Sequence, residues 1–461
     1  MRLLGWALVL VVPPLGYALA VAAGFSVEAS IFTGLMLATV LLWIFRLVEE
    51  FVAPLVAVVG SLFVGLAPPA VALSGFASPS LLLLVGVFAL SATISSSGLS
   101  YRLILQLLIR LPDKPLWHQL ALLGSGYALS PIVPSANTRI SLLKAPFQSM
   151  ADALNLPTGG AALTALLAAL FGGSVLFGPM MVTSKSSNIA AISFLPQQLQ
   201  TEFNGLFWLI AALASLMVVT AAQLLLTARL FPQKTESRLP RQEIRQTLAE
   251  LGPLSSAEWT ASWCFLFFVI GSATVGFHHL KPHLLAGCIL LALLISGSMQ
   301  RQEFRRAIDW PQIWFLLGID SMVKIMDHLG LQQKLATALG GNFNFIHGNI
   351  FLFIIASLLV TLTLRLVLPV TAGALSATVI LLPIATAQAI NPWIAVFSTA
   401  TFSDIAFFRY QGSNGMLQLY SDGLIETVDT TRFLKHNLWM NAARVIAVLA
   451  SIPWWRALGI L

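Results

Sequence analysis

Long apolar segments recur along the whole chain, and they constrain its fold more than any other feature of the sequence. A helix that crosses a lipid bilayer needs about 20 mostly apolar residues. Segments of this kind lie at 3–24, 30–48, 51–72, 80–98, 160–182, 205–231, 258–277, 283–299, 311–328, 348–368, 392–408 and 437–459. Because some of them can be half-spans or hairpins, we expect an all-α polytopic membrane protein with about 11 transmembrane helices.

The composition excludes an ordinary water-soluble domain. Hydrophobic residues make up 57% of the 461 residues and charged residues 9%, whereas soluble domains carry about 25% charged residues. Basic cytoplasmic loops explain the net charge of +7, so we expect no nucleic-acid partner. Cys264 and Cys288 both lie in apolar segments and can form neither a disulfide framework nor a metal cluster.

Two basic loops predict the orientation and the domain boundaries. Their basic residues are Lys234, Arg238, Arg241 and Arg245 in the first, and Arg301, Arg305 and Arg306 in the second. Two spans separate the loops, so both can be cytoplasmic, with the N-terminus inside and the C-terminus outside the inner or plasma membrane. The apolar start, Met1–Phe25, is too long for a typical signal peptide, and we expect it to be a membrane helix. The predicted parts are an N-terminal transmembrane helix (1–29), a first membrane repeat (30–231), a cytoplasmic linker (232–257) and a second membrane repeat (258–461).

The two membrane halves resemble each other in the order and spacing of their residues. At a shift of 232 residues Gly98 aligns with Gly330, and at a shift of 235 PSANTRIS (134–141) aligns with PVTAGALS (369–376). Repeats of opposite orientation are common in secondary transporters, which hold their substrate between discontinuous helices near the bilayer midplane. We therefore expect two inverted repeats.

Proline and polar residues interrupt the first repeat. A continuous helix through Pro131 and Pro134 would lose backbone hydrogen bonds and clash at both rings. We expect a re-entrant turn and then a helix that starts near Ser135, with its free N–H groups aimed at the turn, which suits an anion. A kinked structural helix is the alternative. The candidate binding residues here are Ser135, Asn137, Thr138 and Arg139.

The second repeat has a matching segment, Pro369–Pro383. From its residues alone, binding and packing explain this segment equally well. Its candidate binding residues are Thr371, Gly373, Ser376 and Thr378.

Four segments carry a family resemblance: PSANTR (134–139), ELGPLSSAEW (250–259), RAIDWPQIWFLLGI (306–319) and IPWWRALGIL (452–461). They resemble segments of the divalent anion:sodium symporter family. Residues 134–139 are similar to its tip motif and residues 250–259 to an element that precedes a later helix. Residues 306–319 are similar to the start of another helix, and residues 452–461 to the family's terminus. That family, part of the ion transporter superfamily, carries dicarboxylates, citrate and sulfate. The likeness covers most of the chain.

The resemblance implies an elevator-type carrier with two re-entrant hairpins, usually a homodimer. It implies that Asn137 and Thr138 hold a substrate carboxylate and help to coordinate sodium, while Ser135 supplies a hydroxyl that the family takes from a position occupied here by Ala136. Arg139 and Arg409 are equal candidates for a bidentate contact with the anion, because a guanidinium group matches a carboxylate in geometry. Arg365, just before the second tip, is interpreted as a local structural charge.

A lysine stands where the family has a threonine in a second element, G-T-x-x-N, which compares with residues 184–188. Asn188 matches this element, but Lys185 would repel a sodium ion at low dielectric. Three roles are therefore open for Lys185: it replaces the cation, pairs with the anionic substrate, or extends to the lipid headgroups. The coupling mechanism is also open, and proton coupling, exchange and sodium symport are all alternatives. The second tip lacks the family's S-N-T, which puts a second sodium site in doubt. The candidate coupling residues are Thr183, Ser184, Lys185, Asn188 and Asp404.

Four ionisable residues fall on one face of a predicted span: Asp320, Lys324, Asp327 and His328. Such residues are costly inside a membrane and often functional. One interpretation is an ion pair between Asp320 and Lys324, with the other two side chains at the interface. The other is a proton relay or a gate between a scaffold and a moving domain.

The sequence therefore predicts a secondary active transporter of small anions, of the di- or tricarboxylate or sulfate class, that works by cation-coupled symport or exchange. A sodium/proton or arsenite-type carrier of the same superfamily is the alternative. We expect no enzyme, because the chain has no G-x-S-x-G, H-E-x-x-H or P-loop motif. The expected partners are a small anion, the lipid bilayer and a second copy of the chain, with sodium as the one candidate ion and no other cofactor.

Overall fold

The computed structural model describes residues 2–110, 112, 114–203, 205–232, 241–331, 333–334, 347–407, 411 and 414–461. The regular structure of these residues is helical, which confirms the all-α prediction. Six of the described helices are long and apolar enough to cross a membrane, by length and composition. The expected number of about 11 spans stays a prediction.

The helices follow one another in two halves. The first half contains α1 (Arg2–Ala22), α2 (Val27–Ile44), α3 (Val52–Val64), α4 (Pro69–Ala72), α5 (Pro79–Ser97), α6 (Leu99–Arg110), α7 (Pro115–Leu129), α8 (Ala136–Ala153), α9 (Ala161–Val175), η1 (Gly178–Met180), η2 (Val182–Ser184), α10 (Ser186–Ile192), α11 (Gln197–Glu202), α12 (Leu206–Leu230) and α13 (Arg241–Glu250). The second half contains α14 (Ser256–Ala273), α15 (Val275–His278), α16 (Pro282–Ile295), α17 (Arg301–Arg306), α18 (Trp310–His328), α20 (Ile350–Arg365), α21 (Val370–Ala387), α22 (Pro392–Phe402), α23 (Asn414–Ser421), η5 (Leu424–Thr427), α24 (Thr430–Ala450) and α25 (Ile452–Ala457).

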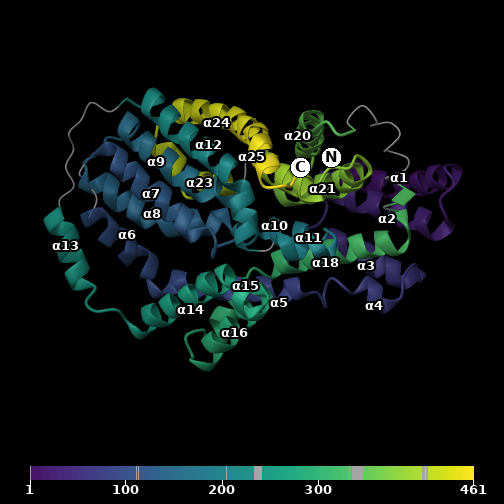
Figure 1. The fold of residues 1–461 in the computed structure, drawn as a ribbon, viewed down its shortest axis with the longest axis horizontal. Helices are drawn as coiled ribbons and strands as arrows, with labels where there is room; N and C mark the ends of the chain where they lie inside the picture. Colours follow the sequence, from purple (N-terminus) through teal and green to yellow (C-terminus); the bar gives the residue numbers. More distant parts are fainter. Residues whose placement is uncertain are drawn as a thin grey trace.

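Two units of the same design form the centre of the molecule. In the first unit, the hairpin of α7 and α8 packs on α9; in the second, the hairpin of α20 and α21 packs on α22. The units lie on opposite sides of the centre in Figure 1, and α12 and α24, which follow them, pack against each other. This is the arrangement of two repeats and two hairpins that the sequence predicts.

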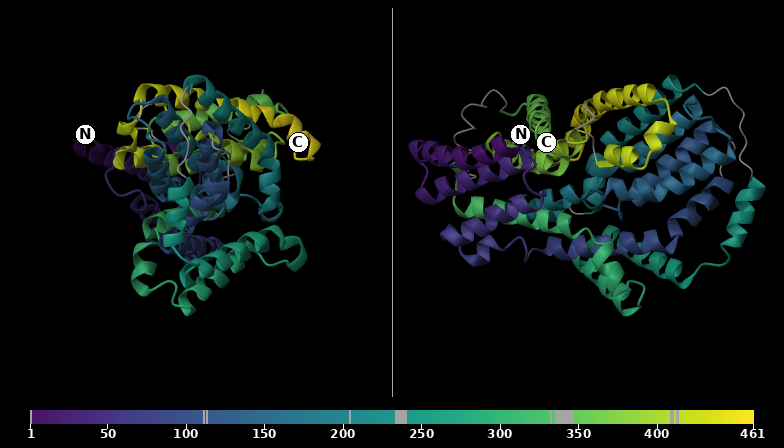
Figure 2. Two further views of the ribbon diagram at one scale, coloured as in Figure 1. Left: turned by 90° about the vertical axis from the view of Figure 1, so that its left-hand side faces the viewer. Right: turned by 180° about the vertical axis from the view of Figure 1, so that it is seen from behind.

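A second group of helices lies along the two units. Helices α5, α14 and α16 pack together, and α18 packs on α3, α4 and α5. The hairpin of α1 and α2 projects from one end of the long axis, and α13 lies at the other end (Figures 1 and 2). We call α3, α5, α14, α16 and α18 the lateral helices.

Proline places both hairpin tips. Helix α7 ends at Leu129, before Pro131 and Pro134, and the Ser135 hydroxyl caps α8 by accepting from the N–H of Thr138. The prediction of a turn and then a helix that starts near Ser135 is confirmed. That this hairpin is re-entrant stays a prediction. In the second hairpin Pro369 occupies the cap position of α21.

Each unit also contains a helix that is interrupted and then resumes. Helix α9 ends at Val175 and α10 begins at Ser186, so residues 176–185 form a first break with two 3₁₀ turns. Helix α22 ends at Phe402 and α23 begins at Asn414; of this second break (403–413), residues 403–407 and 411 are described. The apolar segment 392–408 is therefore not one continuous helix, contrary to the simplest prediction.

The internal alignment marks equivalent helix ends. Helices α5 and α18 both have 19 residues, and Gly98 (φ +79°) and Gly330 (φ +66°) follow them in the left-handed conformation. The same conformation at Gly65 (φ +74°) ends α3 early, so the apolar segment 51–72 forms a short helix and a separate turn instead of one span.

Residues 233–240 of the predicted linker lie outside the described residues, and the domain boundaries stay predictions.

Candidate functional site

Both hairpin tips open onto one small cavity of about 90 Å³. Helix α5 contributes Phe88 to its lining, and the segment before and within α18 contributes Asp309 and Gln312. The cavity brings together these residues predicted from the sequence: Ser135, Asn137, Arg139, Thr371, Lys185 and Asp404. The other candidates, which do not line it, are Thr138, Gly373, Ser376, Thr378, Thr183, Ser184 and Asn188.

The first tip presents a helix N-terminus to this cavity. The first N–H groups of α8 have no partner within the helix, and the positive end of the helix dipole lies here. Ser135 accepts from one of these groups, the N–H of Thr138. The side-chain oxygen of Asn137 is buried without a hydrogen-bond partner. Free N–H groups and an amide at a helix N-terminus suit a carboxylate.

Side-chain oxygens without partners gather at the first break. The Asn188 amide nitrogen donates to the carbonyl oxygens of Gly178 (2.9 Å) and Met181 (3.0 Å), which leaves its own oxygen buried and unpaired. The other unpaired buried oxygens near this break belong to Ser174, Thr183, Ser184 and Ser187. Because buried polar atoms normally have hydrogen-bond partners, this cluster is suited to a hard cation, which binds oxygen atoms.

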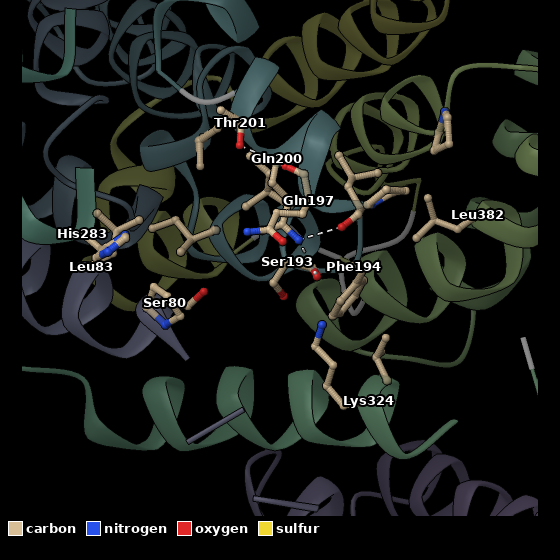
Figure 3. Close-up of a pocket in the computed structure, with 18 of the residues that line it drawn as sticks. Ser80, Leu83, Ser193, Phe194, Gln197, Gln200, Thr201, His283, Lys324 and Leu382 are labelled. Atoms are coloured by element: carbon tan, nitrogen blue, oxygen red, sulfur yellow. Dashed lines mark hydrogen bonds between the residues drawn. The ribbon is translucent and has the colours of Figure 1, made fainter. Parts of the chain in front are cut away.

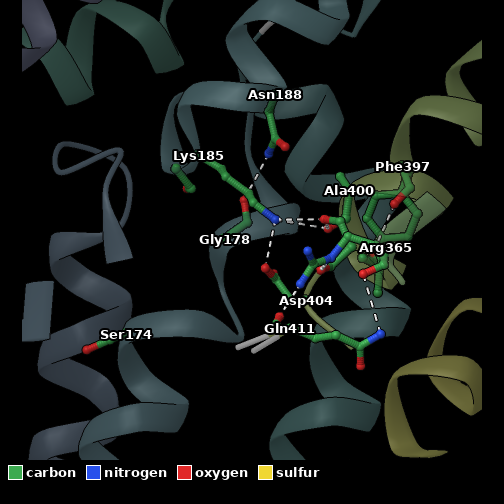
Figure 4. Close-up of polar contacts among 12 residues, drawn as sticks. Ser174, Gly178, Lys185, Asn188, Arg365, Phe397, Ala400, Asp404 and Gln411 are labelled. Carbon is green, nitrogen blue, oxygen red and sulfur yellow. Dashed lines mark hydrogen bonds and ion pairs between the residues drawn. The ribbon is translucent and has the colours of Figure 1, made fainter. Parts of the chain in front are cut away.

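A buried ion pair joins the two breaks. The Lys185 ammonium contacts the Asp404 carboxylate at 2.9 Å, the Ser403 hydroxyl at 3.0 Å and the Ala400 carbonyl at 3.2 Å (Figure 4). The Asp404 side chain is 7% exposed and the Lys185 side chain 15%. Lys185 therefore does not extend to the lipid headgroups, and its charge is held by the second repeat.

Positive charge exceeds negative charge among the described residues of the site. Four cationic side chains interact electrostatically with Asp404: Arg139, Lys185, Arg365 and Arg444. The other carboxylates here are Asp309, which lines the cavity, and Glu50, which acts on Arg365, so four positive charges face three negative ones. An arrangement with surplus positive charge in a low-dielectric surrounding attracts anions.

The two arginines nearest the tips bond to the backbone. The Arg139 guanidinium lines the cavity but donates to the carbonyl groups of Val133, Ser174 and Ser184. Its direct contact with an anion stays a prediction. Arg365, interpreted from the sequence as a local structural charge, also donates to backbone carbonyl groups. Arg409, the other predicted anion contact, lies outside the described residues.

The second tip contributes less polar surface than the first. Thr371 lines the cavity, whereas Thr378 faces α22, where its hydroxyl lies 2.7 Å from that of Thr399. A Cβ atom on Gly373 would lie 3.0 Å from the Arg365 side chain, so this glycine gives the arginine room. These contacts indicate packing for Thr378 and Gly373.

A larger cavity of about 1040 Å³ lies between α10, α11, α21 and the lateral helices α5, α16 and α18. Polar side chains line it, among them Gln197, Gln200 and Lys324 (Figure 3). Size alone favours this cavity, but it contains no hairpin-tip residue. The small cavity, where both tips meet, is therefore the candidate binding site.

The predicted ion pair of Asp320 and Lys324 is absent from the structure. Both residues are described, and no ion pair within 4 Å joins them, because Lys324 is exposed and lines the large cavity. The buried Asp320 carboxylate instead accepts from the Ser193 hydroxyl at 2.9 Å. Asp320 therefore links α18 to the end of α10, and the gate interpretation stays a prediction.

Sequence comparison identifies the family. The family model described as "Citrate transporter" (CitMHS) matches residues 40–401, well over half of the chain. The chain belongs to the citrate transporter family. With the apolar helices, this membership makes it a multi-pass membrane protein.

Three relatives of this citrate transporter family protein share 20–22% of the aligned residues with it. It is 20% identical to the putative malate transporter YflS of Bacillus subtilis, over 84% of this chain and 82% of that protein. It is 22% identical to the inner membrane protein YbhI of Escherichia coli, over 72% of each chain. A membrane protein of Cupriavidus necator matches at 22% identity over 54% of this chain, which spans about half (49%) of that relative.

A solved structure has the same fold. The YdaH transporter of Alcanivorax borkumensis, described as having an unusual topology, superposes with a TM-score of 0.52 at 16% identity. The superposition covers 85% of this chain and 88% of that one. At this level of identity the likeness concerns the fold alone.

Sequence reasoning missed the contribution of α18 to this citrate transporter family site. The Asp309 carboxylate caps α18 by accepting from the N–H of Gln312, and the Gln312 amide nitrogen is buried without a partner. The Asp-Trp-Pro sequence at 309–311 is a recognisable helix start. Nothing in the sequence indicates that this helix start faces the hairpin tips.

Proposed function

We propose that this protein is a secondary active transporter that moves di- or tricarboxylate anions across the membrane. The observation that carries the proposal is a single cavity that both hairpin tips line and that surplus positive charge surrounds. Membership of the citrate transporter family and the name of the malate transporter relative support organic anions as the substrate class.

The first tip supplies most of the binding groups in this proposal. A substrate carboxylate accepts from the free N–H groups at the start of α8 and from the side chain of Asn137, which lines the cavity. Thr371 from the second tip and Gln312 from α18 complete the site. Lys185 and Arg139, which are bonded to protein oxygens, contribute through the field of their charges.

We propose sodium as the coupling ion at the first break. The unpaired oxygens of Asn137, Thr183, Ser184 and Asn188 are the groups available to hold it. At the second repeat the Lys185 ammonium already occupies three oxygens, so we expect a single sodium ion rather than two. The large cavity then serves as the aqueous approach, with Lys324 attracting the anion. We expect a homodimer in the inner membrane.

Uptake into proteoliposomes tests the function. The purified protein is given radiolabelled citrate, malate, succinate or sulfate under a sodium gradient, a proton gradient or neither. We expect saturable uptake of at least one carboxylate, with a first-power dependence on sodium.

The Asn137→Ala variant should raise KM at least about tenfold, because it removes a polar contact to a charged group. The exposed Gln302→Ala variant in α17 should leave KM unchanged. Folded protein that transports none of these anions but exchanges sodium for protons, or carries arsenite, would establish the alternative carrier.

A further inference from the structure

Arg139 ties the first tip to both ends of the first break. Its Nε donates to the carbonyl of Ser174 at 2.8 Å, just before the break. Its Nη1 donates to the carbonyl of Ser184 at 2.8 Å, at the other end, and to that of Val133 in the tip. The side chain is 1% exposed, so these bonds form away from water.

Arg365 makes the same set of contacts in the second unit. Its Nε donates to the carbonyl of Ser403 at 3.0 Å, where the second break begins, and its Nη2 donates to that of Gln411 near its end. Its Nη1 donates to the carbonyl of Leu368 in the second tip at 3.0 Å. The Gln411 amide nitrogen returns a bond to the carbonyl of Arg365 (Figure 4).

The sequence repeat does not account for this equivalence. Val133 and Leu368 are equivalent at the shift of 235 residues, but Arg139 then aligns with Ala374 and Arg365 with Ser130. Arg139 reaches the tip from the helix that follows it, and Arg365 from the helix that precedes it. The two units thus obtain the same contacts from unrelated positions, so the contacts themselves are the shared feature.

We propose that Arg139 and Arg365 are paired positioning residues: each fixes a hairpin tip to the two ends of the neighbouring break, so that tip and break form one unit that binds and carries the anion. The inference rests on the proposed function and names the residues that organise its site. It assigns a role to Arg365, although that residue does not line the cavity.

The physical reason is the unpaired backbone that a break creates. An interrupted helix leaves carbonyl groups without N–H partners, and these are costly when they are buried in an apolar surrounding. The carbonyl oxygens are also partly negative, and they oppose a nearby anion unless a donor holds them. A guanidinium group suits this task because it carries five N–H donors in a rigid plane and stays charged.

Lysine variants distinguish the effect of the arginine's hydrogen-bond geometry from the effect of its positive charge. Lysine keeps the positive charge but lacks the planar fork, so Arg139→Lys and Arg365→Lys should both raise KM for the transported carboxylate at least about tenfold, the effect of losing one bond to a charged group. The matched control is Arg102→Lys. Arg102 is also buried (6% exposed) and donates to the carbonyls of Leu251 and Gly252 as well as to the Glu258 carboxylate, but it takes no part in the cavity. This control should lower the melting temperature and leave KM unchanged.

Hydrogen exchange provides a readout that does not require transport. In Arg365→Lys, amides of the tip (366–368) and of the break (403–407) should exchange faster together, while those of the first unit keep the wild-type rate. An Arg365→Lys protein with wild-type KM and wild-type exchange at both segments would overturn the inference. If the wild type transports none of the anions, the proposed function fails, and exchange alone still decides whether the arginine joins tip and break.

Discussion

At the scale of single residues, one ion pair distinguishes this site. Lys185 and Asp404 are 219 residues apart in the sequence, and each belongs to the break of a different repeat. The sequence identifies both residues, because a lysine and an aspartate in apolar segments are conspicuous. Their pairing could not be predicted, since nothing local in either segment specifies which distant charge it meets.

Removing one member of this pair should destabilise the protein strongly. Asp404→Asn leaves the Lys185 ammonium without its carboxylate, which costs about 3–5 kcal/mol. Lys185→Met should cost less, because Arg139, Arg365 and Arg444 still act on the Asp404 carboxylate. The double variant should cost less than the sum of the two, because neither charge then remains. Thermal unfolding in detergent measures the effect. The exposed pair Arg432–Asp429 gives the control, and Arg432→Met should cost no more than about 1 kcal/mol. A double variant that costs as much as the two single variants together would show that the two residues do not depend on each other.

At the scale of helices, the first hairpin depends on one close approach. Helix α7 packs on α9 where Gly126 meets Gly173, and a Cβ atom on Gly126 would collide with the backbone of Gly173. A Cβ atom on Gly124, two residues earlier in the same helix, would meet nothing within 4 Å. Two glycines in one helix therefore have different roles.

The same substitution should have opposite effects on stability at the two glycines. Gly126→Ala should push α7 away from α9 and lower stability by about 1–3 kcal/mol, the usual cost of overpacking. Gly124→Ala should be neutral or stabilise by up to about 1 kcal/mol, because alanine favours the helix. Melting temperatures of the two variants make the comparison. Equal losses in both would contradict the close packing of α7 on α9 at Gly126.

Helix interruptions can be predicted only where the local sequence causes them. Pro131 and Pro134 forbid a continuous helix, so the sequence predicts the first tip within a residue of its observed helix start. The second break contains no proline and lies in a segment that reads as one apolar span. Distant groups hold it open: Arg365 bonds to its ends, and the Asn441 amide donates to the carbonyl of Ala406 at 2.8 Å. Such contacts exist only in the folded chain.

At the scale of the whole molecule, two similar units meet at one small cavity. Each unit supplies a tip, and the ion pair between the breaks joins them. The repeat in the sequence predicts the two units, and composition predicts their membrane surrounding. Sequence alone could not give the contribution of α18, because Gln312 reaches the cavity only through the packing of the lateral helices. The central claim is that a single anion binds to both tips at once.

Protection of cysteines by substrate tests this claim most directly. In a background with Cys264 and Cys288 replaced by alanine, single cysteines are placed at Ser135 in the first tip, at Thr371 in the second and at Gln197 in the large cavity. The rate of reaction with a small thiol reagent is then measured against carboxylate concentration. The account predicts that one carboxylate protects positions 135 and 371 with the same half-saturating concentration and leaves position 197 reactive. Protection of one tip without the other, or of position 197 alone, would contradict it.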